Sequence, residues 1–149
     1  IARHGMRNSH LTSIAPTGTI SLCADNVSSG IEPVFAHHIA RSVAGPEGGQ
    51  VEVLEDYGVR ELGVYGRTAA QVTVGEHVAV LTTAAQRVDA AVSKTCNIPA
   101  GTAWNDFKEV YRQAWEGGAK GCTTFRLDGY RAGILAPQTH CGIDPHGPC

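Results

Sequence analysis

Apolar residues recur at three- and four-residue steps in two long stretches of the chain, and this spacing predicts two amphipathic helices. The first begins after Thr73, a candidate N-cap because Glu76 stands three positions later in the spacing of a capping box. Its apolar stripe consists of Val78, Leu81, Ala85, Val88 and Val92. Such a stripe is typical of a helix that packs one face on a core.

The second predicted helix runs from about Trp104 to Gly117, where two consecutive glycines end it. Its stripe predicts an aromatic contribution to the core and consists of Trp104, Phe107, Val110, Tyr111, Ala114 and Trp115. Helical periodicity explains these rings without a nucleobase-stacking role. A short strand, Cys122–Arg126, follows, and a helix that feeds a strand is a unit of the α/β class.

A proline-glycine turn lies inside the first third of the chain, between Leu11 and Cys23. The pattern predicts a strand, a turn, and then an extended or helical start. Pro16 fixes its own φ and biases Ala15 toward an extended conformation, while Gly18 permits positive φ and close approach of a ligand.

Hydroxyl and amide donors are dense in this turn. Thr17, Thr19 and Ser21 supply hydroxyls, and the N–H groups from Thr17 through Ser21 can converge on phosphate oxygens. The loop contains no Lys or Arg and no GxxxxGK[ST] pattern, so phosphate would be bound by neutral donors and dipoles. The alternative is a plain Pro/Gly turn between two strands.

The middle of the chain carries less information. Residues 42–50 are rich in turn-forming residues, and Val51–Tyr65 is a mixed segment that favours a short helix with exposed acidic residues. His37 and His38 are adjacent, so on a strand they point to opposite faces and are interpreted as structural. The last residues, 136–149, contain three prolines and no periodicity, which predicts a flexible tail.

The composition sets limits on the function. With 149 residues and 42% hydrophobic content the chain can bury a core, and a net charge of −2 gives no basic surface for nucleic acid. Apolar runs such as Val78–Leu81 are far shorter than the roughly 20 residues of a membrane-spanning helix. We therefore expect a soluble, cytoplasmic protein, and a start at Ile1 rather than Met suggests a fragment.

Five cysteines are scattered without a CxxC pair, so neither a disulfide framework nor a zinc ribbon is indicated and no metal site is predicted. The buried small hydrophobe among them is expected to be Cys96. The five cysteines of the chain are Cys23, Cys96, Cys122, Cys141 and Cys149.

Three blocks of the chain resemble ribonucleotide reductases of the adenosylcobalamin-dependent class. The first, Arg7–Phe35, contains Pro-Thr-Gly-Thr-Ile-Ser and Ser-Ser-Gly-Ile-Glu-Pro. The second, Ala91–Pro99, contains Ser-Lys-Thr, and the third, Asp106–Leu135, contains Lys-Gly-Cys-Thr-Thr-Phe-Arg. The resemblance implies an α/β fold that is the C-terminal portion of a ten-stranded α/β barrel and is incomplete on its own.

The resemblance also implies boundaries and a site. Residues 1–135 would be barrel, with a variable insertion at about 42–72, and residues 136–149 the tail. Glu32 and Lys94 would lie beside the site. An isolated lysine at position 94 would usually be solvated, but beside a phosphate site Lys94 could supply the positive charge that the loop lacks. The substrate-phosphate loop would comprise Ala15, Pro16, Thr17, Gly18, Thr19, Ile20 and Ser21.

Family members reduce ribonucleotides to deoxyribonucleotides by a thiyl radical that adenosylcobalamin generates. The radical cysteine, with its neighbouring Asn and Glu, belongs to a region before this sequence, so no catalytic residue is expected here. Cys141 and Cys149 resemble a redox tail pair that exchanges with a thioredoxin- or glutaredoxin-type reductant. The alternatives are that the two cysteines have no function and are only a product of truncation, or that they bind a metal opportunistically.

The implied partners are the ribonucleotide, the rest of the reductase chain and a second copy in a homodimer. Neither a membrane nor a nucleic acid is among them. Two alternatives remain: a stand-alone nucleotide-binding or structural module without catalysis, and an unrelated globular α/β domain.

Overall fold

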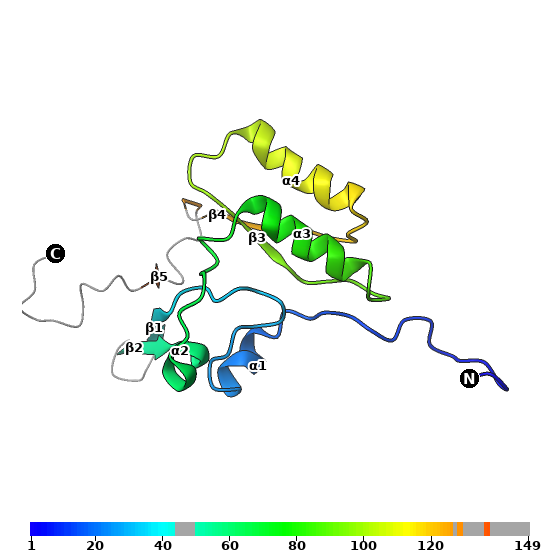
Figure 1. Ribbon diagram of the computed structural model, residues 1–149, viewed down its shortest axis with the longest axis horizontal. Coiled ribbons are helices and arrows are strands. Elements are labelled where there is room, and N and C mark those ends of the chain that lie inside the picture. The colour runs from blue at the N-terminus through cyan, green and yellow to red at the C-terminus, as the bar shows by residue number, and fades with distance from the viewer. Residues whose placement is uncertain (44–49, 127, 130–135, 138–149) are drawn as a thin grey trace, which may run out of the picture.

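Two small sheets and four helices make up the part of the chain that the computed structural model describes, residues 1–43, 50–126, 128–129 and 136–137 (Figure 1). The fold is α/β, as the sequence predicts. The elements in chain order are α1 (Gly18–Cys23), β1 (His38–Val43), β2 (Gln50–Glu55), α2 (Tyr57–Leu62), α3 (Val74–Ala85), β3 (Thr95–Ile98), α4 (Trp104–Glu116), β4 (Thr123–Arg126) and β5 (Ala136–Pro137).

One of the two sheets is parallel and consists of β3 and β4. Its register runs from Thr95 opposite Thr123 to Ile98 opposite Arg126. Parallel neighbours need a crossover, and α4 provides it. Figure 1 shows α4 and α3 side by side above these strands. The chain around Ile14 continues the pattern, because Ile14 forms a parallel bridge with Val92 just before β3. Three segments therefore run in the same direction.

Helix α3 confirms the predicted capping box. The Thr73 hydroxyl accepts from the Glu76 amide at 3.3 Å, and the Glu76 carboxylate accepts from the Thr73 amide at 2.9 Å. The prediction that its apolar stripe continues to Val92 is wrong, since the helix ends at Ala85. Val92 is buried instead in extended chain beside Ile14.

Helix α4 has the predicted position, but the aromatic core stripe is only half correct. Val110 and Ala114 are buried against β3 and α3, whereas Trp104 and Trp115 are 67% and 76% exposed. A helix turns by 100° per residue, so Trp104, Tyr111 and Trp115 share a flank next to the buried one. Three- and four-residue spacing alone does not distinguish the two flanks.

The antiparallel sheet has the order β2-β1-β5, and β1 pairs with β2 from His38 opposite Glu55 to Val43 opposite Gln50. The predicted short helix over Val51–Tyr65 is therefore wrong in its first half, which is strand, and right in its second half, which is α2. Polar and apolar residues alternate from Gln50 to Val53, which is the period of a strand. The Asp56 side chain caps α2 by accepting from the Gly58 amide at 2.9 Å.

Of the predicted tail, Ala136 and Pro137 form β5 beside β1. The proposed redox pair, Cys141 and Cys149, lies outside the described residues.

In the described ranges, no helix has the length and apolar character needed to cross a bilayer.

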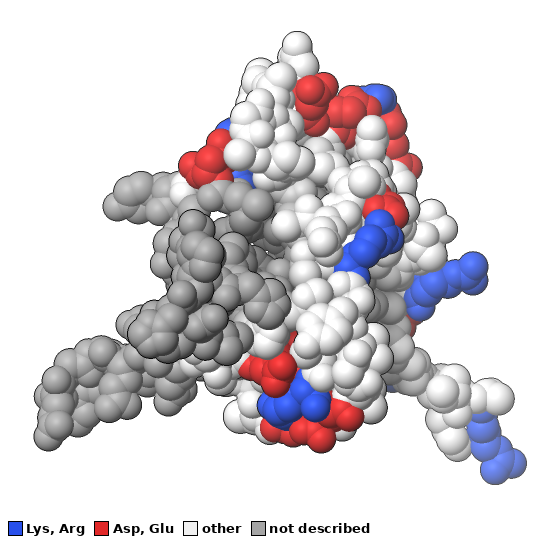
Figure 2. Space-filling view, turned by 60° about the vertical axis from the view of Figure 1, so that its left-hand side comes forward, with Lys and Arg blue, Asp and Glu red and all other residues white. Residues whose placement is uncertain are grey.

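Several charged side chains on the surface of the described chain form ion pairs. Arg60 contacts Asp25 at 2.8 Å, and Arg112 bridges Glu109 and Glu116 on α4. On the face shown in Figure 2, Lys and Arg atoms are separated from one another and form no continuous basic patch.

Candidate functional site

The predicted phosphate loop makes a sharp turn at Thr17, which caps α1 with φ 52° and ψ 23°. Gly18 permits a positive φ, but the left-handed residue is Thr17, and Gly18 is already helical. A threonine adopts this conformation only when its surroundings hold it there. Its hydroxyl oxygen accepts a 2.7 Å hydrogen bond from the Gly30 amide.

Three amides at the start of α1 belong to Gly18, Thr19 and Ile20, and no residue four positions earlier in the helix can accept from them. The Thr17 side chain does not cap them either. Ser21 differs, because its amide donates to Thr17 O at 2.9 Å and its hydroxyl to Gly18 O at 2.7 Å. The loop therefore offers three backbone donors, with Ser21 bracing it from within.

The space in front of Gly18 is open. A Cβ built there would meet no atom of the described chain within 4 Å, and its φ is not positive. The fold itself therefore does not require glycine at this position. A glycine that folding does not require fits a position where a ligand approaches the backbone closely.

A turn at residues 28–32 packs against this loop. The Ser28 hydroxyl donates to Glu32 O at 2.6 Å, and the Glu32 amide donates to Ser29 O at 2.9 Å. Gly30 has φ +56°, and a Cβ there would lie 3.0 Å from Ala15 O. The close approach and the positive φ both require glycine at this point of the turn.

Behind the turn lies a buried ion pair. Lys94 is only 2% exposed, and its Nζ donates to Glu32 Oε2 at 2.6 Å, to Thr95 O at 2.7 Å and to His77 Nδ1 at 2.8 Å. Glu32 Oε1 accepts from the Thr95 amide at 2.5 Å. An ammonium has three N–H groups, and all three are occupied. The expectation of a solvated Lys94 is wrong. Its charge is balanced by Glu32, and its three N–H groups are donated within the protein, so none is left to supply charge directly to the loop.

The sequence reasoning missed His77, which is fully buried in this cluster. Its Nε2 donates to Ala69 O at 3.2 Å, which leaves Nδ1 as the acceptor for Lys94. Burial and the neighbouring Lys94 charge lower the pKa of His77 below its ordinary value of 6.5, so the ring is neutral. Its spacing from Leu81, four positions along α3, could have indicated an inward side chain.

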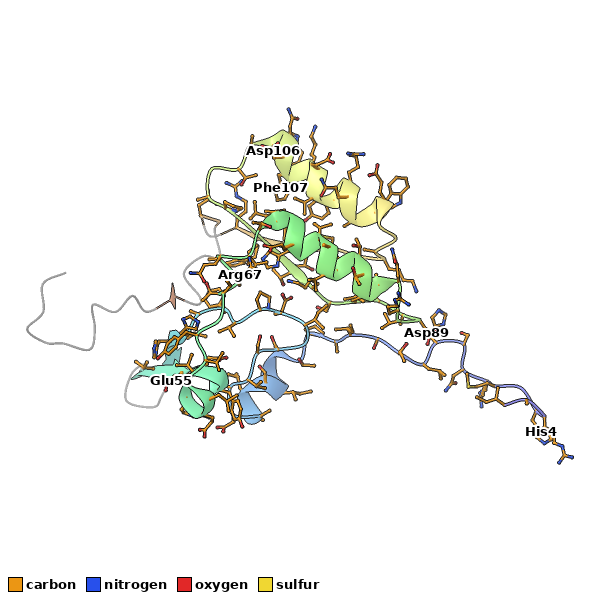
Figure 3. The ribbon with its side chains drawn as sticks, viewed as in Figure 1. His4, Glu55, Arg67, Asp89, Asp106 and Phe107 are labelled. Carbon is orange, nitrogen blue, oxygen red and sulfur yellow. The ribbon has the colours of Figure 1, made fainter. Side chains whose placement is uncertain are left out.

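An open hollow of about 460 Å³ lies beside the cluster and is lined by Glu32, Lys94, His77, Arg67 and Glu76 among others. Arg67, labelled in Figure 3 where the chain enters α3, forms a bidentate pair with Glu76 at 3.0 and 3.1 Å. That contact lowers the pKa of Glu76 to about 2. Among the described residues no group of three or more His, Cys, Asp or Glu side chains is placed to hold a metal ion.

Asp89 anchors the segment that leads into the loop, at the junction visible in Figure 3. Its Oδ2 accepts from the amides of Leu11 and Thr12 at 3.1 and 3.2 Å and from the Thr12 hydroxyl at 3.1 Å. These hydrogen bonds lower the pKa of the Asp89 carboxyl, and Lys120 donates to its backbone oxygen. Asp89 therefore fixes the approach to the loop.

Two thiols meet between the parallel strands. Cys96 Sγ lies 3.9 Å from Cys122 Sγ, with Cys96 fully buried, as predicted, and Cys122 half-buried. The hydrogen bond from the Cys96 thiol lowers the pKa of Cys122 to about 7. The same contact, together with burial, raises the pKa of Cys96. The thiolate therefore forms first on the more accessible sulfur.

We expect iodoacetamide to alkylate Cys122 with a midpoint near pH 7, because only the thiolate reacts, while Cys96 stays unlabelled. Peptide mapping by mass spectrometry across a pH series measures both sites separately. In a Cys96→Ala variant the midpoint of Cys122 should rise toward its ordinary value of 9.0. Labelling of Cys96 before Cys122 contradicts this order.

Comparison with known proteins shows which family this loop and the Lys94 cluster belong to. Residues 1–125 match the family model described as the ribonucleotide reductase barrel domain. The chain belongs to the ribonucleotide reductase family. The resemblance read from the three sequence blocks is thus confirmed, and the matched residues of this reductase barrel domain include the loop, the turn at residues 28–32 and the Lys94 cluster.

Among curated proteins, this reductase chain is 32% identical to the vitamin B12-dependent ribonucleoside-diphosphate reductase of Mycobacterium tuberculosis (strain H37Rv) over 163 residues, 91% of the chain and 23% of the relative. The enzyme of the same name from Thermoplasma acidophilum is 34% identical over 161 residues, 90% of the chain and 21% of the relative. The vitamin B12-dependent ribonucleotide reductase of Streptomyces coelicolor is 26% identical over 160 residues, which are 83% of the chain and 16% of the relative. The chain spans about a fifth of these relatives.

Proposed function

We propose that this chain is the C-terminal portion of the ten-stranded α/β barrel of a vitamin B12-dependent ribonucleotide reductase. The whole protein would convert ribonucleoside diphosphates to deoxyribonucleotides by a thiyl-radical mechanism. The proposal is supported by the names of the relatives and by the three parallel segments at Ile14, β3 and β4. Helix α4 joins β3 to β4, and α1, the antiparallel pair β1 and β2, α2 and α3 lie between Ile14 and β3. Parallel strands joined by helices are the building unit of an α/β barrel.

Within that protein the chain supplies the substrate-phosphate loop, residues 15–21. The observation that carries this role is the set of open amides at Gly18, Thr19 and Ile20 in front of a glycine that the fold does not require. The loop follows directly after the parallel segment at Ile14. Ligands of α/β barrels bind at this carboxyl end of the strands, and backbone amides suit phosphate oxygens.

Adenosylcobalamin is the cofactor by family, and its site lies in other parts of the protein. The hollow beside Lys94, about 460 Å³, is smaller than a corrin ring with its nucleoside, and the charged groups that line it are already paired. The residues that line this hollow therefore do not fit the cofactor. The reductant in this proposal is a cytoplasmic thioredoxin- or glutaredoxin-type dithiol, and the whole protein a homodimer.

Gly18→Ala in the full-length reductase tests the loop. The methyl group meets no protein atom within 4 Å, and alanine favours a helical position over glycine, so thermal stability should be equal or higher. The same methyl would occupy the space of the diphosphate, and we expect the KM for cytidine diphosphate to rise about tenfold or more. Steady-state kinetics and a thermal melt measure the two effects.

The matched control is Gly75→Ala, which also lies in the first turn of a helix with open space around it. This variant should leave KM unchanged. A Gly18→Ala enzyme with the KM of the parent would rule out the loop as the phosphate site.

The alternative of a stand-alone binding module is decided by the coding DNA upstream of Ile1. An open reading frame that encodes the radical cysteine with its neighbouring Asn and Glu supports the reductase. A start codon directly before Ile1 supports the module.

A further inference from the structure

The phosphate loop is held in its conformation by contacts from outside itself. Thr17 adopts φ 52° at the start of α1, a helix of only 6 residues with no buried side chain. Neither local propensity nor packing of α1 therefore fixes this turn. The hydrogen bond from the Gly30 amide to the Thr17 hydroxyl, 2.7 Å long, is the side-chain contact that does so.

Gly30 is in turn fixed through Glu32. The turn at residues 28–32 is closed by two hydrogen bonds, from Ser28 Oγ to Glu32 O and from the Glu32 amide to Ser29 O. The Glu32 carboxylate then joins this turn to β3, through the Thr95 amide on Oε1 and Lys94 Nζ on Oε2. Hydrogen bonds, linked through the backbone of the turn and the Glu32 side chain, thus connect β3 to Thr17.

Lys94 occupies the buried end of this path. Its side chain is 1% exposed, against 22% for Glu32, and each of its N–H groups already has an acceptor in the protein. An ammonium so enclosed has no donor left for a phosphate oxygen. It can affect substrate binding only through the groups that it holds.

We propose that Glu32 and Lys94 are positioning residues of the substrate-phosphate loop: their ion pair fixes the turn at residues 28–32 on β3, and that turn holds Thr17. This inference rests on the proposed function of the loop and adds the residues that set its geometry. The pair does not touch the phosphate. It acts through the Gly30 amide.

Glu32→Gln in the full-length reductase tests the proposal, with cytidine diphosphate as substrate. The amide keeps the size of the side chain and an acceptor for Thr95, but it presents no anion to Lys94. We expect KM to rise about tenfold while kcat at saturating substrate stays within about twofold, because the loop binds at a distance from the reacting ribose carbons. A purely structural role would instead lower the active fraction, and with it kcat, at unchanged KM, and that result would overturn the proposal.

Glu109→Gln is the matched control, because Glu109 also pairs with a cation, Arg112, but on the exposed face of α4. It should change neither constant. If Glu32→Gln yields no folded enzyme, the double variant Glu32→Gln and Lys94→Gln removes both charges and avoids an unpaired one. The double variant should fold and keep a raised KM, and a parental KM in it would overturn the proposal.

Gly18→Ala separates this inference from the proposed function. If that variant leaves KM unchanged, the loop is not the phosphate site and both proposals fail. If it raises KM while Glu32→Gln does not, the loop binds phosphate and only the positioning role fails.

Discussion

Lys94→Met should destabilise the region around β3 by about 3–5 kcal/mol, the largest effect that we expect from a single substitution in this chain. Removing the ammonium leaves the Glu32 carboxylate without a counter-ion and takes the donor away from His77 Nδ1. The Lys94 side chain is 1% exposed and His77 is fully buried, whereas the Glu32 side chain is 22% exposed beside the open hollow. The buried His77 acceptor would be left with neither partner nor hydration, and the Glu32 carboxylate would lose its counter-ion while it regains only part of its hydration.

Hydrogen exchange of the amides in β3 measures this locally within the full-length protein. The exchange should accelerate about a hundredfold or more, because each 1.4 kcal/mol is about a factor of ten. Lys108→Met is the control, since Lys108 reaches over the exposed ring of Trp104 and should change stability by less than about 0.5 kcal/mol. Equal exchange rates in the two variants would show that the buried pair contributes nothing to the strand.

Local signals in the sequence were sufficient for much of the fold. Thr73 and Glu76 predict the start of α3, and two consecutive glycines predict the end of α4. The strand after α4 was likewise predicted, as was the buried Cys96. These features depend on residues within a few positions of one another, so a single sequence carries them.

The Lys94 cluster could not be predicted in the same way. Glu32 and Lys94 are 62 positions apart, and Lys94 and His77 are 17 apart. Their meeting depends on how the turn at residues 28–32 packs on β3, which the three-dimensional arrangement alone decides. An isolated lysine in a sequence is most often solvated, and that general expectation fails here.

In the phosphate loop, the sequence predicts the position of the turn but not its backbone conformation. The glycine at position 18 permits a positive φ, yet the left-handed residue is Thr17, where the hydrogen bond from the Gly30 amide stabilises it. The pattern therefore predicts the place of the turn but not which residue has the left-handed conformation. Tertiary contacts can hold a residue in a conformation that its type disfavours.

Gly117→Ala should destabilise the packing of α3 on α4 by about 1–3 kcal/mol. A Cβ at Gly117 would lie 2.3 Å from Thr82 Cγ2 and 2.8 Å from Thr82 Cβ. Thr82 cannot easily rotate away, because its hydroxyl donates to Val78 O at 3.0 Å and its Cβ is fixed by the helix. The two helices must therefore move apart, although Gly117 itself has an ordinary φ of −76°.

Thermal unfolding and hydrogen exchange of α3 measure this effect, with Gly75→Ala as the control in open space. Adding Thr82→Ala to Gly117→Ala removes the 2.3 Å contact but leaves the one at 2.8 Å, so the double variant should recover part of the lost stability. The two substitutions should thus be non-additive, as expected for side chains in contact. Purely additive effects would mean that the glycine serves the end of the helix, a role that the positive φ of Gly118, +80°, already fulfils.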